Sequence, residues 1–168
     1  MVDFLDELEA NVPALRRYAR ALTRNIDRAD DLVQDCLERA ISRRGLFRSG
    51  GPVRPWLFTI LTNLHRNALR TERRHGPTVD MDTLPELGTP APQPAHMALN
   101  EIARAIDTLP LDQKEALLLV TLEGTPYAEA AAILQIPLGT LMSRLGRARS
   151  ALRQLTGATH EPHLRTVK

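Results

Sequence analysis

Apolar residues recur at helical spacing along most of the chain, most regularly between residues 28 and 43. Seven residues of this run follow one another in steps of three and four, on one face of an α-helix: Ala29, Leu32, Val33, Cys36, Leu37, Ala40 and Ile41. The same period predicts helices over residues 13–23, 55–70 and 98–108, two of them starting at Pro13 and Pro55. An apolar segment that ends at Gly124 predicts a further helix over residues 110–123. Because Ala and Leu are abundant and β-branched runs are scarce, we expect an all-α fold.

The last third of the chain is predicted to contain a helix-turn-helix. A short Ala-rich helix capped by Thr125 ends near Leu134, and a longer helix follows Pro137. The longer helix has an apolar stripe at Leu138, Leu141, Met142, Leu145, Ala148 and Leu152. Its opposite face carries Thr140, Ser143, Arg144 and Arg147, flanked by Arg149 and Arg153. A basic outer face of this kind is typical of DNA binding, although a helical hairpin with solvated arginines is the simpler alternative.

A proline-rich segment separates this part of the chain from the first helices. Five prolines lie between residues 76 and 97, where they disfavour regular structure. We therefore expect two small helical modules, residues 1–75 and 98–156, joined by a flexible linker at 76–97. The second module ends in the helix-turn-helix, and residues 157–168 form a tail.

The charge is distributed in blocks, although the net charge is only +2. Residues 1–74 carry 14 Lys+Arg against 10 Asp+Glu, and residues 124–168 carry 6 against 2. The segment between them is acidic: residues 75–98 carry none against 3, and residues 99–123 carry 2 against 5. Two basic blocks around an acidic middle suggest two nucleic-acid contacts on two modules. Nearly all the basic residues are arginines, whose side chains suit contacts with phosphates and guanine edges.

Two helices of the first module have polar faces that suggest binding partners. The helix over residues 28–43 exposes Asp30, Asp31, Gln34, Asp35 and Glu38. Its acidity extends beyond the first turn, where the helix dipole would favour it, and so suggests a protein partner with a basic surface. The helix over residues 55–70 presents Thr59, Asn63, Arg66, Asn67 and Arg70. Amides and guanidinium groups at this spacing can contact bases and phosphates, or they can be plain surface residues.

Several classes of function have no support in the sequence. Cys36 is the single cysteine, so we expect neither a disulfide nor a cysteine metal site. The five histidines show no ligand spacing, and no catalytic constellation is visible. Without a signal-peptide pattern or a long apolar run, the chain is expected to be cytoplasmic and not inserted in a membrane. We expect no metal, no cofactor, no small-molecule substrate and no enzymatic activity.

The chain resembles the extracytoplasmic-function (ECF) sigma factors, a class of bacterial promoter-recognition subunits. Four stretches carry the resemblance, in the order and with the gaps of that family. They are residues 15–23 (LRRYARALT), 30–40 (DDLVQDCLERA), 55–70 (PWLFTILTNLHRNALR) and 109–119 (LPLDQKEALLL), the last continued by 127–152. The stretch from Leu15 to Asp35 is also similar to the general-stress branch of the family.

The resemblance implies roles for the polar faces described above. Core RNA polymerase would be bound by Asp30, Asp31, Gln34, Asp35 and Glu38. The −10 element would be contacted by Arg48, Arg54, Asn63, Arg66, Asn67 and Arg70. The −35 element would be contacted by Thr140, Ser143, Arg144, Arg147 and Arg149. The implied partners are core RNA polymerase, promoter DNA and an anti-sigma factor. One departure is Gln135, which stands where the family usually has glycine and would need a positive φ.

Two other functions are compatible with parts of the sequence. A sigma-mimicking adaptor that sequesters an anti-sigma factor would share the helices, but it would not need the DNA-reading residues Asn63, Arg66, Arg144 and Arg147. A dimeric helix-turn-helix repressor would explain residues 125–155, but not the acidic helix or the polar face over residues 63–70.

Overall fold

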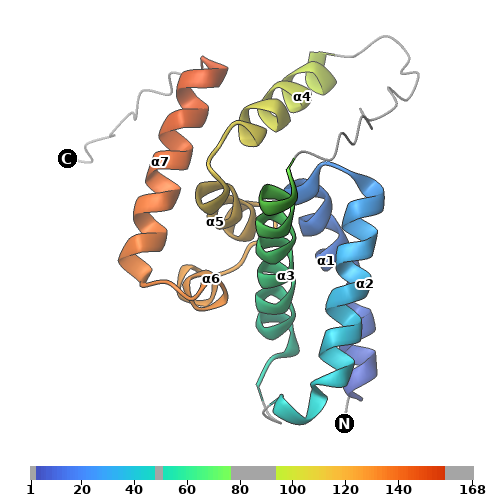
Figure 1. Cartoon of the computed structure of the whole chain (residues 1–168). Coiled ribbons are helices and arrows are strands. Elements are labelled where there is room, and N and C mark those ends of the chain that lie inside the picture. Colours follow the sequence, from blue (N-terminus) through green and yellow to red (C-terminus); the bar gives the residue numbers. More distant parts are fainter. Residues whose placement is uncertain (1–2, 48–50, 77–93, 158–168) are drawn as a thin grey trace, which may run out of the picture.

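The computed structural model describes residues 3–47, 51–76 and 94–157, and within them the chain is helical without strands (Figure 1). The α-helices are α1 (Phe4–Thr23), α2 (Ile26–Ser42), α3 (Val53–His75), α4 (Pro94–Asp107), α5 (Leu111–Thr121), α6 (Tyr127–Leu134) and α7 (Leu138–Thr156). A short 3₁₀ helix, η1 (Arg44–Leu46), follows α2. The all-α prediction is confirmed, including the short and long helices of the helix-turn-helix, α6 and α7.

Helices α1, α2 and α3 pack against one another as a three-helix bundle (Figure 1). Its center is formed by Leu15, Tyr18, Cys36 and Leu57, all fully or almost fully buried. The rings of Tyr18 and Phe58 lie 5.3 Å apart between centroids, in the tilted arrangement that aromatic pairs favour. Asn25 caps α2, since its side-chain oxygen accepts a hydrogen bond from the backbone N–H of Arg28 at 2.9 Å.

Helix α5 lies at the center of the second group of helices and also reaches the first. It packs against α6 and α7 on its own side and against α1 of the bundle, while α3 packs against α6. Six consecutive residues of α5, from Lys114 to Leu119, are buried. A helix covered on all sides has no amphipathic stripe, which is why α5 shows little helical periodicity. The two predicted modules are therefore in direct contact in this structure.

The first helix corrects the prediction that a helix starts at Pro13. Helix α1 runs without interruption from Phe4 to Thr23, and Pro13 lies inside it. A proline at this place removes one backbone hydrogen bond. Leu8 and Leu15, on either side of Pro13, are both buried in the same core. Their burial keeps the two halves in one helix.

Helices α3 and α4 both begin before the predicted positions. Helix α3 starts at Val53, where the side chain is buried, rather than at Pro55. Helix α4 starts at Pro94, inside the stretch predicted to be linker. The rest of that stretch, residues 77–93, lies outside the described residues, as does Arg48.

Several predicted core residues are instead exposed. On α4, Leu99 and Ile102 lie at the helical spacing expected of core residues but are 63% and 44% exposed, whereas Ala105 is buried. On α7, Leu138 and Met142 are 46% and 55% exposed, whereas Leu141, Leu145 and Ala148 are buried. The buried stripe of α7 is thus narrower than predicted. The exposed face of its first turns is correspondingly wider, which matters for the interface described below.

At the turn between α6 and α7, Gln135 has the expected positive φ. The N-terminal cap of α6, in contrast, differs from the prediction. Gln135 has φ 56° and ψ 45°, the left-handed region that glycine normally occupies. The N–H of Ile136 donates to the carbonyl of Ala131 at 3.0 Å, which closes the end of α6. The N-terminal cap of α6 is Pro126, so the prediction of Thr125 as the cap is wrong. Thr125 is buried, and its N–H donates to Leu119 O.

A buried histidine on α3 makes the stability of the bundle sensitive to pH. His65 is almost fully buried, and its Nδ1 has no hydrogen-bond partner among the described residues. Burial, with Lys114 and Arg66 nearby, lowers the pKa of His65 from 6.5 to about 4. The unfolded chain therefore binds a proton below pH 6.5 that the folded chain does not bind until about pH 4, so the free energy of unfolding falls over this interval.

We expect His65→Gln to remove about 2 kcal/mol from the difference in unfolding free energy between pH 7 and pH 5. The glutamine does not titrate, so the proton uptake that favours the unfolded chain is lost. Urea denaturation of both proteins at the two pH values measures the difference. An identical pH dependence in the two proteins would contradict the assignment to His65.

Candidate nucleic-acid interface

The polar face predicted on the third helix lies on the side of α3 that meets the second group of helices. Asn63 and Arg66 are half-buried, and Asn67 and Arg70 are exposed. Arg70 and Arg73 extend the same side toward the end of the helix, and neither forms an ion pair with another described residue. The face therefore has two parts, one covered by α5 and one open to solvent.

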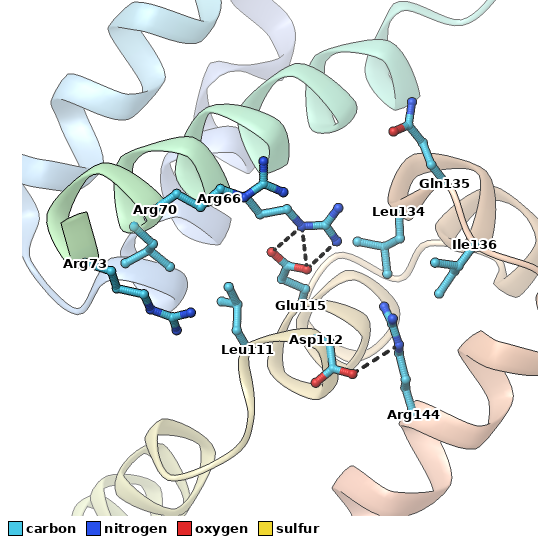
Figure 2. Close-up of a pocket in the computed structure, with 11 residues that line it drawn as sticks. Arg66, Arg70, Arg73, Leu111, Asp112, Glu115, Leu134, Gln135, Ile136 and Arg144 are labelled. Carbon is cyan, nitrogen blue, oxygen red and sulfur yellow. Dashed lines mark hydrogen bonds and ion pairs between the residues drawn. The ribbon is translucent and has the colours of Figure 1, made fainter.

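The covered part contains a bidentate ion pair between the two groups of helices (Figure 2). The guanidinium of Arg66 contacts the carboxylate of Glu115 on α5, with Nη2 to Oε2 at 2.6 Å and Nε to Oε1 at 3.0 Å. The side chain of Glu115 is 1% exposed and that of Arg66 is 24% exposed. Burial raises the pKa of the Glu115 carboxyl, and the contact with Arg66 opposes that rise. The same contact raises the pKa of Arg66 and keeps it charged.

A second carboxylate, Glu123 in the segment between α5 and α6, holds two arginines of the bundle. Its oxygens accept from Arg17 Nη2 at 2.7 Å and from Arg54 Nη2 at 3.0 Å. The side chain of Glu123 is completely covered. Arg54 also lies over the ring of Phe58, 5.0 Å from the centroid. One buried carboxylate thus fixes the start of α3 and the middle of α1 to the second group of helices.

Two further contacts join the same groups of helices at their other edge. Lys114 is buried, and its Nζ donates to Leu22 O at 3.1 Å and to Asp107 Oδ1 at 2.9 Å. Asp107 in turn accepts from Arg24 Nε at 2.8 Å. The seam between the groups therefore consists of charged pairs together with apolar packing.

The outer face of α7 is open to solvent in its first turns. Ser143 and Arg147 are exposed, Thr140 is half-buried, and Arg147 has no ion-pair partner among the described residues. Arg149 is also exposed, and its Nη2 donates to the hydroxyl of Tyr127 at 3.1 Å. Arg144 differs from the others, because it turns toward α5 and its Nε lies 3.3 Å from Asp112 Oδ2 (Figure 2). The structure thus separates Arg144 from the residues that sequence analysis grouped with it.

An open cavity of about 520 Å³ lies between α3, α5 and α7 (Figure 2). Four arginines line it, namely Arg66, Arg70, Arg73 and Arg144. Asp112 and Glu115, one turn apart on α5, supply its negative charge. The cavity therefore brings arginines from both predicted DNA-contacting helices to a single place, on the two sides of one acidic helix.

One face of α2 carries four carboxylates and one amide and forms a separate surface, which we call the acidic stripe (Asp30, Asp31, Gln34, Asp35 and Glu38). Four of them are exposed, and Gln34 Nε2 donates to Glu38 Oε1 at 3.0 Å. Asp30 is half-buried and lies within 3.7 Å of Arg16 and Arg20 on α1. Asp31 and Asp35 also line a cavity of about 370 Å³ with Leu109 and Leu111. The stripe is thus open to a partner along most of its length.

Comparison with known proteins assigns the chain to a family. Residues 8–62 match the family model described as the Sigma2 domain of PhyR, and residues 99–152 match the model of sigma-70 region 4. The ECF RNA polymerase sigma factor EcfG of Rhodopseudomonas palustris is 45% identical over 150 residues, which are 89% of this chain and 83% of the relative. The chain belongs to the ECF sigma factor family. The ECF RNA polymerase sigma-E factor of Escherichia coli K12 is 31% identical over 150 residues, covering 81% and 78% of the two chains.

A solved sigma factor has a similar arrangement of helices. The sigma factor RpoE of Bartonella quintana, in its complex with the anti-sigma factor NepR, superposes with a TM-score of 0.78 at 35% identity. The superposition covers 94% of this chain and 98% of that one, so it includes both groups of helices. Among the described residues of the present sigma factor, no helix is long and apolar enough to cross a membrane.

Sequence analysis missed the residues of this ECF sigma factor that hold the two groups of helices together. Lys114, Glu115 and Glu123 were not singled out, although all three have buried side chains. One signal was available: Lys114 and Glu115 directly precede an uninterrupted apolar run, Ala116 to Val120. Charged residues next to such a run are buried only when they are paired. Their partners could not be identified, because Arg66 and Leu22 lie far away in the sequence.

Proposed function

We propose that this ECF sigma factor binds core RNA polymerase and directs transcription initiation at promoters with −35 and −10 elements. The proposal rests on where the polar and charged helix faces lie. A basic and amide-bearing face on α3, a second polar and basic face on α7, and an acidic stripe on α2 lie on distinct helices. Three such surfaces fit one protein partner and two DNA elements. As a specificity subunit, the protein would act in the cytoplasm and would not itself be an enzyme.

Each of the two modules would bind its own promoter element. Residues 1–75 would bind polymerase through the acidic stripe and the −10 element through Arg54, Asn63, Arg66, Asn67 and Arg70, with Arg48 as a further candidate. Residues 98–156 would bind the −35 element through Thr140, Ser143, Arg144, Arg147 and Arg149. Residues 76–97 would serve as the linker, and the tail 157–168 has no assigned role.

The first turns of α7 support its use as the recognition helix. A recognition helix contacts base edges with residues near its N-terminus. Ser143, Gly146 and Arg147 are exposed in that part of α7, at the spacing of one helix face. The inward position of Arg144 makes Arg147 the stronger candidate for a base contact in this structure.

An anti-sigma factor is the proposed regulator. The relative from Bartonella quintana was solved with the anti-sigma factor NepR, and its helices superpose on both modules of this chain. In the present structure the two modules are in contact, and Arg66 and Arg54 are half-buried in ion pairs with carboxylates of the second module. An arrangement that covers residues proposed for DNA binding suits an inhibited state. Because the stretch from Leu15 to Asp35 resembles the general-stress branch of the family, we also propose a role in a general stress response.

The alternative is an adaptor that sequesters an anti-sigma factor. One observation favours it, namely that residues 8–62 match a family model taken from PhyR, and the PhyR of Bartonella quintana is an anti-anti-sigma factor. The exposed Arg147 and Asn67 favour a DNA-binding protein instead, because a mimic needs no base-contacting residues. A repressor acting alone would leave the acidic stripe without a role.

Run-off transcription tests the proposal directly. Purified core polymerase is incubated with and without this protein on a library of genomic fragments. Discrete new start sites that share sequences near −35 and −10 are the expected result. Binding to an anti-sigma factor without binding to core polymerase would instead support the adaptor.

A further inference from the structure

We infer that carboxylates of the second module act as an intramolecular competitor of promoter DNA. Asp112, Glu115 and Glu123 each hold an arginine that the proposed function assigns to a promoter element. The inference rests on the proposed function and concerns how the free protein is kept from binding DNA. We call the arrangement in which these contacts are made the closed state.

Glu115 supplies the central contact. An arginine fork fits a carboxylate and a phosphate with the same bidentate geometry, so the two anions compete for it directly. Arg66 directs one edge of its guanidinium at Glu115, with Nη2 to Oε2 at 2.6 Å and Nε to Oε1 at 3.0 Å. The side chain of Arg66 is 24% exposed and lines the open cavity, but this bidentate edge is occupied by the carboxylate. A DNA phosphate can therefore take this edge only after Glu115 has moved away from Arg66.

Glu123 performs the same role at the start of α3. It accepts from Arg54 at 3.0 Å and from Arg17 at 2.7 Å, and its side chain is fully covered. The segment that includes these carboxylates, residues 99–123, has five acids against two bases. Its negative charges face the basic first module, as the phosphates of bound DNA would do.

Asp112 extends the pattern to the other DNA-contacting helix. It lies one turn before Glu115 on α5, and it holds Arg144 of α7 at 3.3 Å (Figure 2). One edge of α5 thus binds an arginine from each helix proposed to contact the promoter. Arg70 and Arg73 line the open cavity beside it and have no carboxylate partner within the described part of the chain, so they can make the first contact with an incoming phosphate.

The closed state is suited to reversal. A buried ion pair contributes little net stability, because the cost of removing both charges from water offsets most of their attraction. The contacts form because the modules are tethered, which keeps their effective concentration high. A partner that binds both modules in a separated arrangement can therefore open the protein, and DNA then replaces the carboxylates.

The experiment uses the full chain with dyes on cysteines introduced at Glu9 and Gln154, both exposed, while Cys36 is fully buried. Energy transfer between the dyes reports the separation of the modules. Binding to a short single-stranded DNA of mixed sequence is measured by fluorescence anisotropy on the same protein. The variant is Glu115→Gln with Glu123→Gln, which preserves side-chain volume. The control, Glu101→Gln with Glu129→Gln, removes the same charge outside the contacts.

The expected result is lower energy transfer and about tenfold tighter DNA binding for the variant than for the control, since the arginine forks become available. Adding Arg54→Gln and Arg66→Gln to the variant should abolish most of that gain. Unchanged energy transfer, or opening without a gain in affinity, would overturn the inference. A gain that persists without both arginines would do the same. The proposed function is judged separately, by run-off transcription with the unmodified chain.

Discussion

Replacing two residues of the acidic stripe, Asp31→Lys with Asp35→Lys, is expected to weaken binding to core RNA polymerase by about 100-fold or more. Both side chains are exposed on α2, one turn apart. Two reversals convert attraction to a basic partner surface into repulsion and leave the partner's charges unpaired. Because neither side chain is buried in the bundle, the fold should tolerate the change.

Titration of fluorescent protein with core polymerase, at low and at physiological salt, measures this effect. The matched control is Glu9→Lys with Glu101→Lys, which makes the same charge change at two exposed positions outside the stripe. The control should bind core polymerase nearly as the unmodified protein does. Equal loss in both proteins would assign the effect to net charge rather than to the stripe. Full binding by the stripe variant would show that the acidic stripe of α2 does not contact polymerase.

Local structure was the part of this protein most accessible from sequence. The periodic stripe of residues 29–41 predicted α2 and most of its buried face, although Ile41 is exposed, because a single helix face determines both spacing and burial. The break between α6 and α7 was predicted because Pro137 disfavours helical geometry at the residue before it, Ile136. The positive φ of Gln135 was expected only from the resemblance to the family. Errors arose where a local rule met a competing long-range contact. Pro13 remained inside α1 because leucines on both sides of it are buried in one core.

The contact between the modules could not be predicted by the same reasoning. It joins Glu115 to Arg66 and Glu123 to Arg17 across long stretches of chain, and no periodicity relates such residues. The charge blocks of the sequence indicated attraction between a basic first module and the acidic segment after the linker. They did not indicate that the attraction is local, bidentate and buried. The roles of the exposed residues toward polymerase and DNA remain predictions.

The same contact divides the predicted DNA-binding arginines into two kinds. Arg54, Arg66 and Arg144 are engaged by carboxylates, whereas Arg70 and Arg147 are open to solvent. Substituting an engaged arginine changes both the closed state and DNA binding. Its effect on transcription therefore combines a gain from opening the closed state with a loss from the missing DNA contact. An open arginine gives a cleaner test of the promoter interface. For this reason Arg147 is preferable to Arg144 for testing α7.

Arg147→Glu is expected to reduce −35-dependent transcription by about 100-fold, through loss of a base or phosphate contact and repulsion of the DNA. The side chain is exposed and makes no ion pair with another described residue, so the helical fold and the closed state should be unchanged. Binding to core polymerase should also be unchanged, because the acidic stripe lies on another module. Run-off transcription from a promoter identified with the unmodified protein measures the loss.

Arg104→Glu is the matched control, since Arg104 is exposed on α4 in the same module and is not assigned to DNA. It should retain most of the activity, whereas Arg147→Glu should lose it on every promoter that requires a −35 element. Arg144→Ala should show a smaller loss, because removing it also frees α7 from Asp112. If Arg147→Glu and Arg104→Glu lost activity equally, net charge rather than recognition would account for the effect. If Arg144→Ala caused the larger loss without reducing core binding, Arg144 would have to turn outward on DNA, and α7 would then change its contact with α5 when the promoter is bound.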